Sequence, residues 1–137
     1  MSQPANKLQI IECSRDAMQG LHDFIPTATK IKYIQTLLSV GFDTLDCGSF
    51  VSPKYIPQMA DTAEVLRALD LSDTKTRLSV IVANTRGAEE AAGFEQVNFM
   101  GYPFSISETF QVRNTNSTII QALDTVKQLQ EICTNAD

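Results

Sequence analysis

The sequence predicts a parallel α/β fold made of four successive β/α units. Strand-like and helix-like segments alternate along all 137 residues, which is the order expected when helices connect parallel strands. No linker composition, short repeat or low-complexity tract interrupts this alternation. The length allows one domain with a substantial core and is short for two typical domains. We therefore expect residues 1–137 to form one domain.

The first unit is a strand at residues 8–13 followed by a helix. Pro26 and Thr27 open that helix, and Gly41 is placed to end it. Apolar residues recur at helical spacing between these two points, which indicates one buried face. They are Ile31, Ile34, Leu37 and Leu38.

The second unit has a strand at residues 44–47, a loop containing Pro53 and Pro57, and a helix that begins near Asp61. Asp61 followed three residues later by Glu64 has the form of a capping box, with Asp in place of the usual Ser or Thr. In such a box each of the two side chains accepts a hydrogen bond from a backbone N–H at the start of the helix.

The third and fourth units complete the series. A strand at residues 78–83 is almost wholly apolar, as expected of a strand buried on both faces, and a short helix follows it as far as Ala92. Residues 96–100 form the fourth strand, which leads into a polar loop ending at Asn116 and a final helix from Ser117. The apolar positions of that helix are Ile119, Ile120, Leu123, Val126 and Cys133.

Composition excludes several classes of protein. Apolar residues make up 43% of the chain and charged residues 20%, which is ordinary for a globular protein. No stretch approaches the roughly 20 apolar residues that cross a bilayer, and the net charge of −5 disfavours nucleic acid as a partner. Residues 1–7 are polar and show no signal or transit peptide, so we expect a cytoplasmic location without membrane association.

The three cysteines and the one histidine form no recognisable ligand pattern. Cys13, Cys47 and Cys133 are odd in number and lack C-x-x-C spacing, which argues against a disulfide scaffold and a structural zinc site. We expect each to be reduced and to serve mainly in packing. His22 has no second imidazole near it in the sequence and is expected to be a loop residue.

Reactive groups in parallel β/α proteins gather at the carboxyl ends of the strands. This rule selects residues 15–19, 49–54, 84–85 and 105–116. Arg15 and Asp16 can form a surface ion pair, worth about 0–1 kcal/mol. Alternatively, Asp16 supplies an oxygen ligand to a divalent cation while Arg15 donates hydrogen bonds to an oxygen that becomes anionic during a reaction. These two residues alone leave both interpretations open.

Two segments resemble a known family. Residues 15–19, Arg-Asp-Ala-Met-Gln, resemble the Arg-Asp-Gly-x-Gln motif of the DRE-type metal-dependent TIM-barrel lyases and synthases. Residues 49–59 are similar to the Ser-Phe-Val-Ser-Pro-Lys segment of 3-hydroxy-3-methylglutaryl-CoA lyases, which the related synthases lack. The resemblance runs from Lys7 to the end of the chain. It implies that residues 1–137 are the first four β/α units, the amino-terminal half, of a pyruvate carboxyltransferase-like TIM barrel.

The resemblance also implies a role for each of five side chains. The family cleaves 3-hydroxy-3-methylglutaryl-CoA to acetyl-CoA and acetoacetate by a metal-assisted retro-Claisen reaction, in which an Arg stabilises the thioester enolate. By similarity, Asp16 binds the divalent cation, magnesium or manganese, and Arg15 stabilises the enolate. Gln19 either contacts the acyl-CoA substrate or orders the site, and Ser49 is expected to hydrogen-bond the substrate. Asp46 lies where related lyases carry Glu and is expected to orient Arg15.

The same resemblance implies that the site is incomplete. In the family, a His-x-His pair, an Asn and a catalytic Cys come from later β/α units, so we expect this chain alone to lack turnover. Residues 105–116 correspond to a family segment near the acyl-CoA entrance, where Arg113 either meets a CoA phosphate or is solvated.

Four strands cannot close a barrel that requires about eight. We therefore expect the chain to be part of a longer polypeptide or to form a homo-oligomer. Inward-facing side chains of the strands would then lack the opposing half of their core, and we expect them to come from among Ile10, Ile11, Leu45, Val80, Ile81, Val97 and Phe99.

Three other assignments compete with the lyase assignment. The chain can be a non-catalytic half-barrel or interaction module, which residue inspection leaves open. A synthase that runs the related condensation is disfavoured by residues 49–59. A flavodoxin-like domain needs a Gly-rich turn after its first strand to receive a phosphate, and Arg15 and Asp16 occupy that turn instead.

Overall fold

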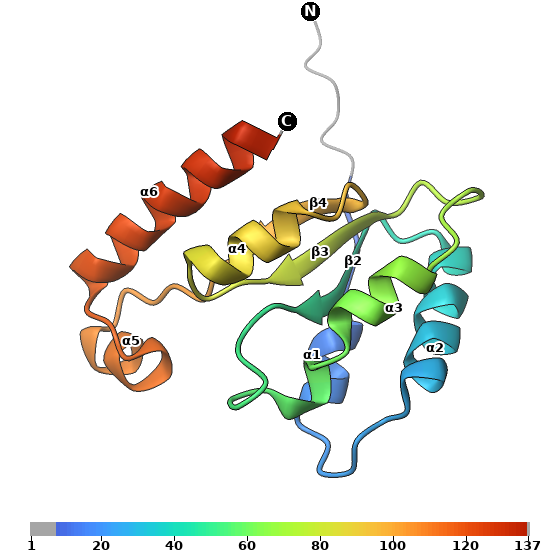
Figure 1. The fold of residues 1–137 in the computed structure, drawn as a ribbon, viewed down its shortest axis with the longest axis horizontal. Coiled ribbons are helices and arrows are strands. Elements are labelled where there is room, and N and C mark those ends of the chain that lie inside the picture. The colour runs from blue at the N-terminus through green and yellow to red at the C-terminus, as the bar shows by residue number, and fades with distance from the viewer. Residues whose placement is uncertain (1–7, 137) are drawn as a thin grey trace, which may run out of the picture.

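A computed structural model describes residues 8–136 and contains one four-stranded sheet with helices between the strands (Figure 1). All neighbouring strands are parallel, and their order in the sheet is β1-β2-β3-β4. The elements in chain order are β1 (Ile11–Glu12), α1 (Ser14–Gln19), α2 (Thr27–Val40), β2 (Thr44–Ser49), the 3₁₀ helix η1 (Pro57–Met59), α3 (Thr62–Ala68), β3 (Arg77–Ile81), α4 (Thr85–Ala92), β4 (Val97–Gly101), α5 (Glu108–Thr115) and α6 (Ile119–Ala136). Four β/α units in sequential order are what the sequence predicted.

Turn chemistry predicted the first long helix correctly. Pro26 precedes α2 with a φ of −54°, and Gly41 follows it in the left-handed conformation with a φ of 84°. Glycine is favoured there because it carries no Cβ to clash with the preceding turn. Ile34 and Leu38 are buried beneath α2, and Ile31 and Leu37 pack beside them, so the predicted apolar face is confirmed.

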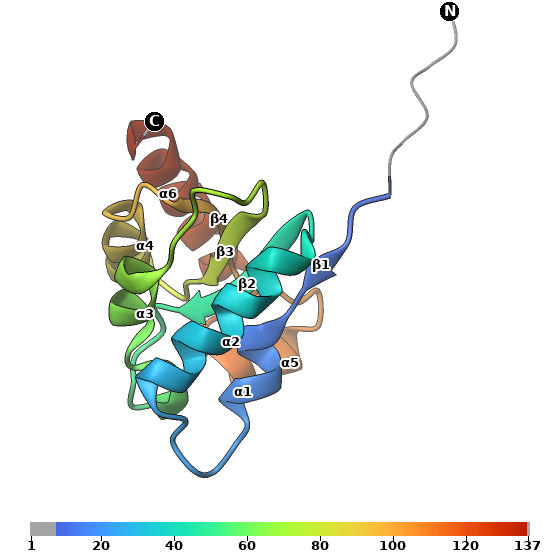
Figure 2. The same cartoon turned by 90° about the vertical axis from the view of Figure 1, so that its right-hand side faces the viewer.

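The hydrophobic core lies between the sheet and α2, α3, α4 and α6. Leu45, Leu78 and Val80 of the strands are fully buried there. Figures 1 and 2 show α3 and α4 on the same side of the sheet. Burying one fully enclosed Leu or Val in such a layer stabilises the fold by about 1.5–3 kcal/mol. This layer corresponds to the outer helices that parallel strands require.

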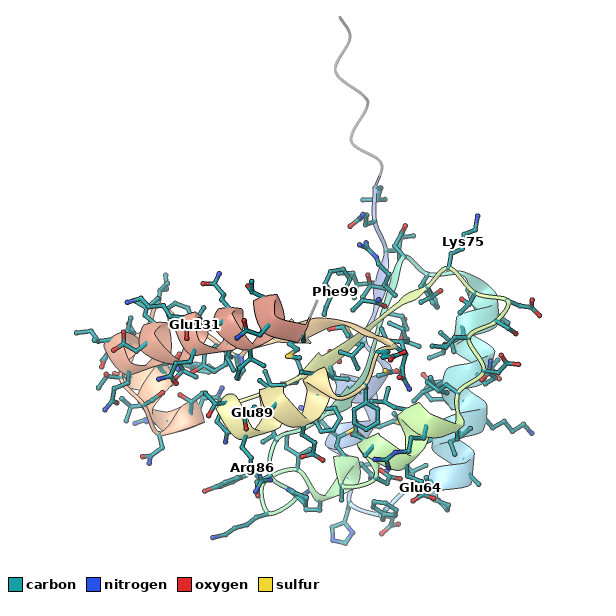
Figure 3. The ribbon with its side chains drawn as sticks, turned by 45° about the horizontal axis from the view of Figure 1, so that its top comes forward. Glu64, Lys75, Arg86, Glu89, Phe99 and Glu131 are labelled. Atoms are coloured by element: carbon teal, nitrogen blue, oxygen red, sulfur yellow. The ribbon has the colours of Figure 1, made fainter. Side chains whose placement is uncertain are left out.

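The opposite face of the sheet is only partly covered by the described residues. Ser79 and Ile81 of β3 alternate with buried Leu78 and Val80 and are half-buried, so burial of β3 on both faces was a wrong prediction. Phe99, labelled in Figure 3, pairs with Ser79 and remains 40% exposed. Leu45 and Val80, which were candidates for this inward face, lie in the helix-side core instead. The reason is register, because alternate residues of a strand point to opposite faces.

Three local predictions were wrong in their boundaries or partners. β1 spans Ile11–Glu12 rather than residues 8–13, since it is an edge strand with one neighbour. The predicted polar loop at 105–116 contains α5, which Ser107 caps by accepting a hydrogen bond from the Phe110 N–H at 3.4 Å. Asp61 stands at the start of α3 without a capping hydrogen bond from its side chain, because its carboxylate pairs with Lys30 at 2.7 Å.

The last helix buries a different stripe from the one predicted. Ala122 and Leu129 are the buried residues of α6, whereas Ile120 is 74% exposed and Leu123 is 47% exposed. α6 packs against α4, whose own buried positions are small, and the small Ala122 side chain lets the two helices approach closely.

An open sheet of this kind predicts association in solution. The two edge strands present unpaired backbone groups, and Ile11 and Phe99 are exposed beside them. We expect multi-angle light scattering of the isolated chain to show a mass that rises with protein concentration above that of one chain. A stable monomer that unfolds cooperatively at all concentrations would contradict this expectation.

Candidate active site

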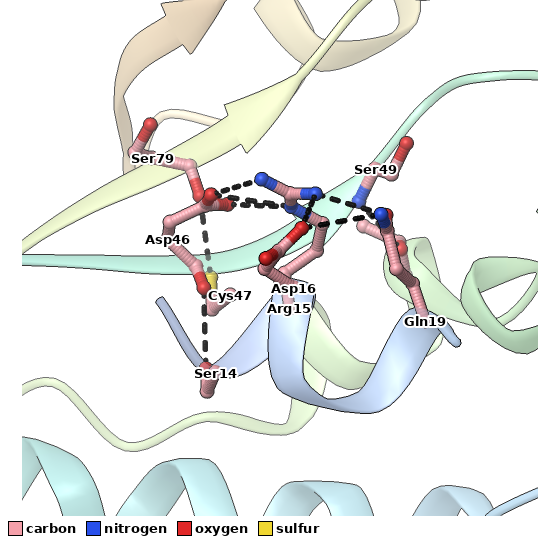
Figure 4. A network of polar contacts seen from close by, with 9 residues as sticks. Ser14, Arg15, Asp16, Gln19, Asp46, Cys47, Ser49 and Ser79 are labelled. Atoms are coloured by element: carbon pink, nitrogen blue, oxygen red, sulfur yellow. Dashed lines mark hydrogen bonds and ion pairs between the residues drawn. The ribbon is translucent and has the colours of Figure 1, made fainter. Parts of the chain in front are cut away.

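Helix α1 begins directly after β1 and holds three of the predicted site residues at the carboxyl end of that strand. Ser14, which is fully buried, donates a hydrogen bond from Oγ to the Asp46 carbonyl oxygen at 3.2 Å. Met18 is buried on the same helix. The Ser14 hydrogen bond ties α1 to β2, and Arg15, Asp16 and Gln19 lie beside β2 on the same helix (Figure 4).

Arg15 and Asp46 form a bidentate ion pair that connects α1 with β2. The Arg15 Nη2 donates to Asp46 Oδ2 at 2.6 Å, and Nε donates to Oδ2 at 3.1 Å and to Oδ1 at 3.2 Å. The side chains are 14% and 10% exposed. Geometry of this kind holds the guanidinium in one orientation. Asp46 therefore contacts Arg15 as predicted, although its catalytic role stays a prediction.

The electrostatics keep Arg15 a cation. Burial lowers the pKa of Arg15, but the hydrogen bond and charge of Asp46, with a smaller contribution from Asp16, outweigh it and the pKa is raised. A guanidinium that is charged, oriented and largely shielded from water is suited to stabilising a developing negative charge.

Asp16 and Gln19 complete a four-residue network with Arg15 at its centre. Arg15 Nη1 donates to Asp16 Oδ1 at 3.1 Å and to Gln19 Oε1 at 2.9 Å, and Gln19 Nε2 donates to the same Asp16 Oδ1 at 3.2 Å. The Asp16 side chain is 67% exposed. Both of these hydrogen bonds to Asp16 use Oδ1, so the carboxylate reaches solvent while its neighbours fix its orientation.

A bulge in β2 brings Asp46 and Ser49 to the same face of the sheet. Asp46 pairs with Ser79 and Gly48 pairs with Val80, so Cys47 is an extra residue in the ladder. In a regular strand, residues three apart point to opposite faces, and the bulge reverses this for Ser49. A Cβ at Gly48 would lie 2.5 Å from the Thr62 side chain, so glycine permits α3 to approach here.

Ser49 is held by its own loop. It is 2% exposed, its Oγ accepts a hydrogen bond from the Val51 N–H at 3.2 Å, and its N–H donates to Thr62 Oγ1 at 3.0 Å. The hydroxyl therefore shapes the turn after β2 in this conformation, and its contact with substrate stays a prediction. Thr62 was missed in the sequence because nothing local marks a hydroxyl that bonds a residue 13 positions away.

The third segment selected from the sequence has a structural use. Asn84 caps α4 by accepting a hydrogen bond from the Gly87 N–H at 2.9 Å. A Cβ on Gly87 would lie 2.7 Å from the Phe50 carbonyl oxygen, which is closer than real Cβ contacts. Gly87 therefore lets α4 pack directly on the loop that follows Ser49, a role that the sequence pattern did not reveal.

The remaining titratable candidates lie apart from the network or are inert. Cys47 is buried, and burial followed by the charge of Asp46 raises its pKa to about 12. Cys13 and Cys133 are exposed, so the prediction that all three cysteines mainly pack was wrong for these two. His22 is a fully exposed loop residue beside Asp23, as predicted. Arg113 is exposed in the last turn of α5.

The network by itself supplies one candidate metal ligand. Among residues 8–136 there is no group of three or more His, Cys, Asp or Glu side chains that could hold a metal ion. Asp16 is the accessible carboxylate, whereas both oxygens of Asp46 bond Arg15. The donor set fits one oxygen ligand from this chain and needs further ligands from elsewhere.

This chain resembles known proteins in both sequence and structure. No protein-family model matches the chain. A mitochondrial hydroxymethylglutaryl-CoA lyase from Arabidopsis thaliana is 37% identical over 119 residues, which are 85% of this chain. This chain is a relative of the hydroxymethylglutaryl-CoA lyases. The resemblance inferred from residues 15–19 and 49–59 is confirmed.

Solved lyase structures have the same fold over this chain. The HMG-CoA lyase from Brucella melitensis superposes with a TM-score of 0.85 at 34% identity and covers 96% of this chain. An HMG-CoA lyase from Acinetobacter baumannii, solved with coenzyme A and 3-methylmalate, superposes with a TM-score of 0.85 at 30% identity, also over 96% of this chain. The TIM-barrel fold class, represented by a half barrel of four β/α units, is confirmed.

The match covers less than half of each relative. The chain spans 25% of the Arabidopsis thaliana protein, 46% of the Brucella melitensis chain and 43% of the Acinetobacter baumannii chain. This partial coverage fits the amino-terminal half predicted from the sequence. No helix within residues 8–136 is both long enough and apolar enough to cross a bilayer. Relatives bear both mitochondrial and cytoplasmic names, so the cytoplasmic location stays a prediction.

Proposed function

We propose that this chain supplies the amino-terminal half of the active site of a carbon–carbon lyase that cleaves 3-hydroxy-3-methylglutaryl-CoA to acetyl-CoA and acetoacetate. The observation that carries the proposal is the network of Arg15, Asp16, Gln19 and Asp46 at the carboxyl ends of β1 and β2. It stands where β/α barrels hold their reacting groups, in a chain whose relatives are named as lyases of this substrate.

Each residue of the network has a defined task in that reaction. The guanidinium of Arg15 donates to the thioester oxygen, on which negative charge accumulates as the carbon–carbon bond breaks. Asp46 holds Arg15 in place and lowers the cost of burying its charge, and Gln19 orders both Arg15 and Asp16. Because the donors are fixed before reaction, little reorganisation is needed when the enolate forms.

Asp16 is the residue proposed to hold a divalent cation, magnesium or manganese. Hard divalent cations prefer carboxylate oxygens, and the exposed carboxylate of Asp16 is kept in place by Arg15 and Gln19. Such an ion, when bound, lowers the pKa of the substrate's tertiary hydroxyl. The missing ligands are proposed to come from β/α units outside this chain.

The substrate class, partners and location follow from the same proposal. The partner is an acyl-CoA substrate, which agrees with the coenzyme A in the Acinetobacter baumannii lyase structure. Either a carboxyl-terminal half or a second copy of the chain is proposed to complete the barrel. A cytoplasmic location is proposed because a relative from Danio rerio, 35% identical over 125 residues, is named as a cytoplasmic lyase.

A chimeric enzyme tests the proposal. This chain replaces the matching part of the Brucella melitensis lyase, and the product is assayed for acetoacetate and acetyl-CoA from 3-hydroxy-3-methylglutaryl-CoA. The proposal expects turnover that needs the added cation. A folded chimera that forms no acetoacetate would favour the alternative of a non-catalytic half-barrel, and a chimera that only condenses acyl-CoA would favour a synthase.

The same chimera allows a prediction for Asp16. The change Asp16→Asn keeps the size of the side chain and its Oδ1 acceptor but removes the charge that a divalent cation needs. We expect the magnesium or manganese concentration at half-maximal activity to rise by about tenfold or more. The measurement is a metal titration of activity, with Asp23→Asn, at a fully exposed loop carboxylate, as the matched control. Equal metal dependence in the two variants would remove Asp16 from the metal site.

A further inference from the structure

Two buried polar side chains outside the Arg15 network, Lys30 and Gln58, connect the α1–α2 loop with η1 and the start of α3. These two residues and their hydrogen-bond partners are called the Lys30–Gln58 cluster below. Lys30 lies in α2 and is 2% exposed, and Gln58 lies in η1 and is 4% exposed. A buried charge or amide is costly unless its hydrogen bonds are made. The partners of these two residues therefore show what the cluster holds together.

Gln58 binds the loop between α1 and α2 at three points. Its Oε1 accepts a hydrogen bond from the Ile25 N–H at 2.8 Å, and its Nε2 donates to the Asp23 carbonyl at 2.9 Å and to the Leu21 carbonyl at 3.3 Å. An amide side chain offers four hydrogen bonds in total, and three of them go to this one loop. The loop is thereby fastened to η1, although His22 and Asp23 at its tip are fully exposed.

Lys30 binds both η1 and the start of α3. Its Nζ donates to the Gln58 carbonyl oxygen and to Asp61 Oδ1, the latter at 2.7 Å, and lies 3.9 Å from the centre of the Phe24 ring. The Asp61 Oδ2 atom is buried and has no hydrogen-bond partner among residues 8–136. Lys30 thus ties α2, the backbone of η1, the start of α3 and the α1–α2 loop at one point.

The Lys30–Gln58 cluster is connected to both α1, which carries Arg15, and the loop that follows Ser49. On one side, the Leu21 N–H donates to the Met18 carbonyl at 3.0 Å, so the clamped loop continues directly into the helix that carries Arg15. On the other side, Thr62 follows Asp61, donates to the Met59 carbonyl at 2.8 Å and accepts from the Ser49 N–H. A shift at Gln58 would therefore move α1 relative to the Ser49 loop.

We propose that Gln58 and Lys30 are positioning residues that set α1 against the loop after β2 and so fix where Arg15 and Asp16 stand. Neither touches the Arg15 network directly. The catalytic importance of this positioning rests on the proposed lyase function. The positioning itself is a property of this chain and is tested without any activity measurement.

The test compares two glutamines that each bridge separate segments. Gln58→Met removes the three bonds to the α1–α2 loop. Gln35→Met is the matched control, because Gln35 bridges α2 to the second residue after α3 through the Asp70 carbonyl at 2.8 Å and the Asp70 N–H at 3.0 Å. Amide hydrogen exchange and the NMR signal of the Arg15 Nε–H are recorded for the 137-residue chain and both variants.

We expect Gln58→Met to speed exchange at the Ile25 amide by about five- to tenfold, the effect of losing one hydrogen bond. It should also shift the Arg15 Nε–H signal and speed its exchange with water, because the pairing with Asp46 loosens. Gln35→Met should speed exchange at the Asp70 amide and leave the Arg15 signal unchanged. A role in stability alone would lower the melting temperature without moving the Arg15 signal.

An Arg15 signal that stays unchanged while the Ile25 amide is released would overturn the proposal, as would equal shifts in the two variants. If Gln58→Met does not fold, Gln58→Asn is judged by the same comparison, since it keeps the amide and shortens its reach by one methylene. An inactive chimera would contradict the lyase proposal without affecting this NMR result. Failure of the lyase proposal can therefore be distinguished from failure of the positioning proposal.

Discussion

Replacing Arg15 with Gln in the chimeric lyase is expected to lower kcat by about 10²–10³, with a smaller effect on KM. The hydrogen bond from Arg15 strengthens only as charge develops on the thioester oxygen, so its loss falls mainly on the transition state. The matched control is Arg67→Gln. Arg67 is an exposed cation in the last turn of α3 and packs on Phe94, and its removal should leave kcat nearly unchanged.

Loss of Arg15 also affects its buried partner Asp46, so the Arg15→Gln variant can lose stability as well as turnover. Arg15→Gln leaves the Asp46 carboxylate, which is 10% exposed, without its counter-charge, and breaking such a buried pair costs about 3–5 kcal/mol of stability. The double variant Arg15→Gln with Asp46→Asn removes both charges and should recover much of that stability. We expect its turnover to stay low, so a double variant with near-normal kcat would contradict the assignment of Arg15 to the enolate.

Much of the fold was predictable because its signals are local. Pro26 and Gly41 mark the ends of α2 through backbone conformations that few other residues favour. The meeting of Arg15 and Asp46 was predictable for a different reason, since both follow parallel strands whose carboxyl ends share one edge of the sheet.

The errors arose where a distant partner decides the local structure. Asp61 has the right spacing to cap α3, but Lys30, 31 residues away, takes its carboxylate. The bulge at Cys47 depends on how β2 pairs with β3 and on the room that Gly48 leaves for Thr62. No pattern within residues 44–49 reveals the β2–β3 pairing or the space beside Gly48. The burial of Ser49 and its place on the same face as Asp46 therefore became evident only from the structure.

The isolated 137-residue chain is expected to show no lyase turnover. Asp16 is one carboxylate, and residues 8–136 provide no cluster of three or more His, Cys, Asp or Glu side chains to hold an ion. A single exposed carboxylate binds magnesium or manganese weakly in water, so neither the substrate hydroxyl nor the enolate would receive the charge stabilisation that the reaction needs. Arg15 alone supplies one donor of a site that the resemblance implies is built from two halves.

The measurement is acetoacetate formation from 3-hydroxy-3-methylglutaryl-CoA with the purified chain and either cation, against a metal-free control. The chain carrying Arg15→Gln is assayed in parallel, because a contaminating host lyase would give equal activity in both preparations. Metal-dependent product from the unaltered chain that is lost in the variant would show that copies of this half assemble a complete site together. In that case the ligands beyond Asp16 would have to come from a second copy of this chain across the open sheet face, and mixing the Asp16→Asn chain with the unaltered chain should then lower activity in proportion to the mixed pairs formed.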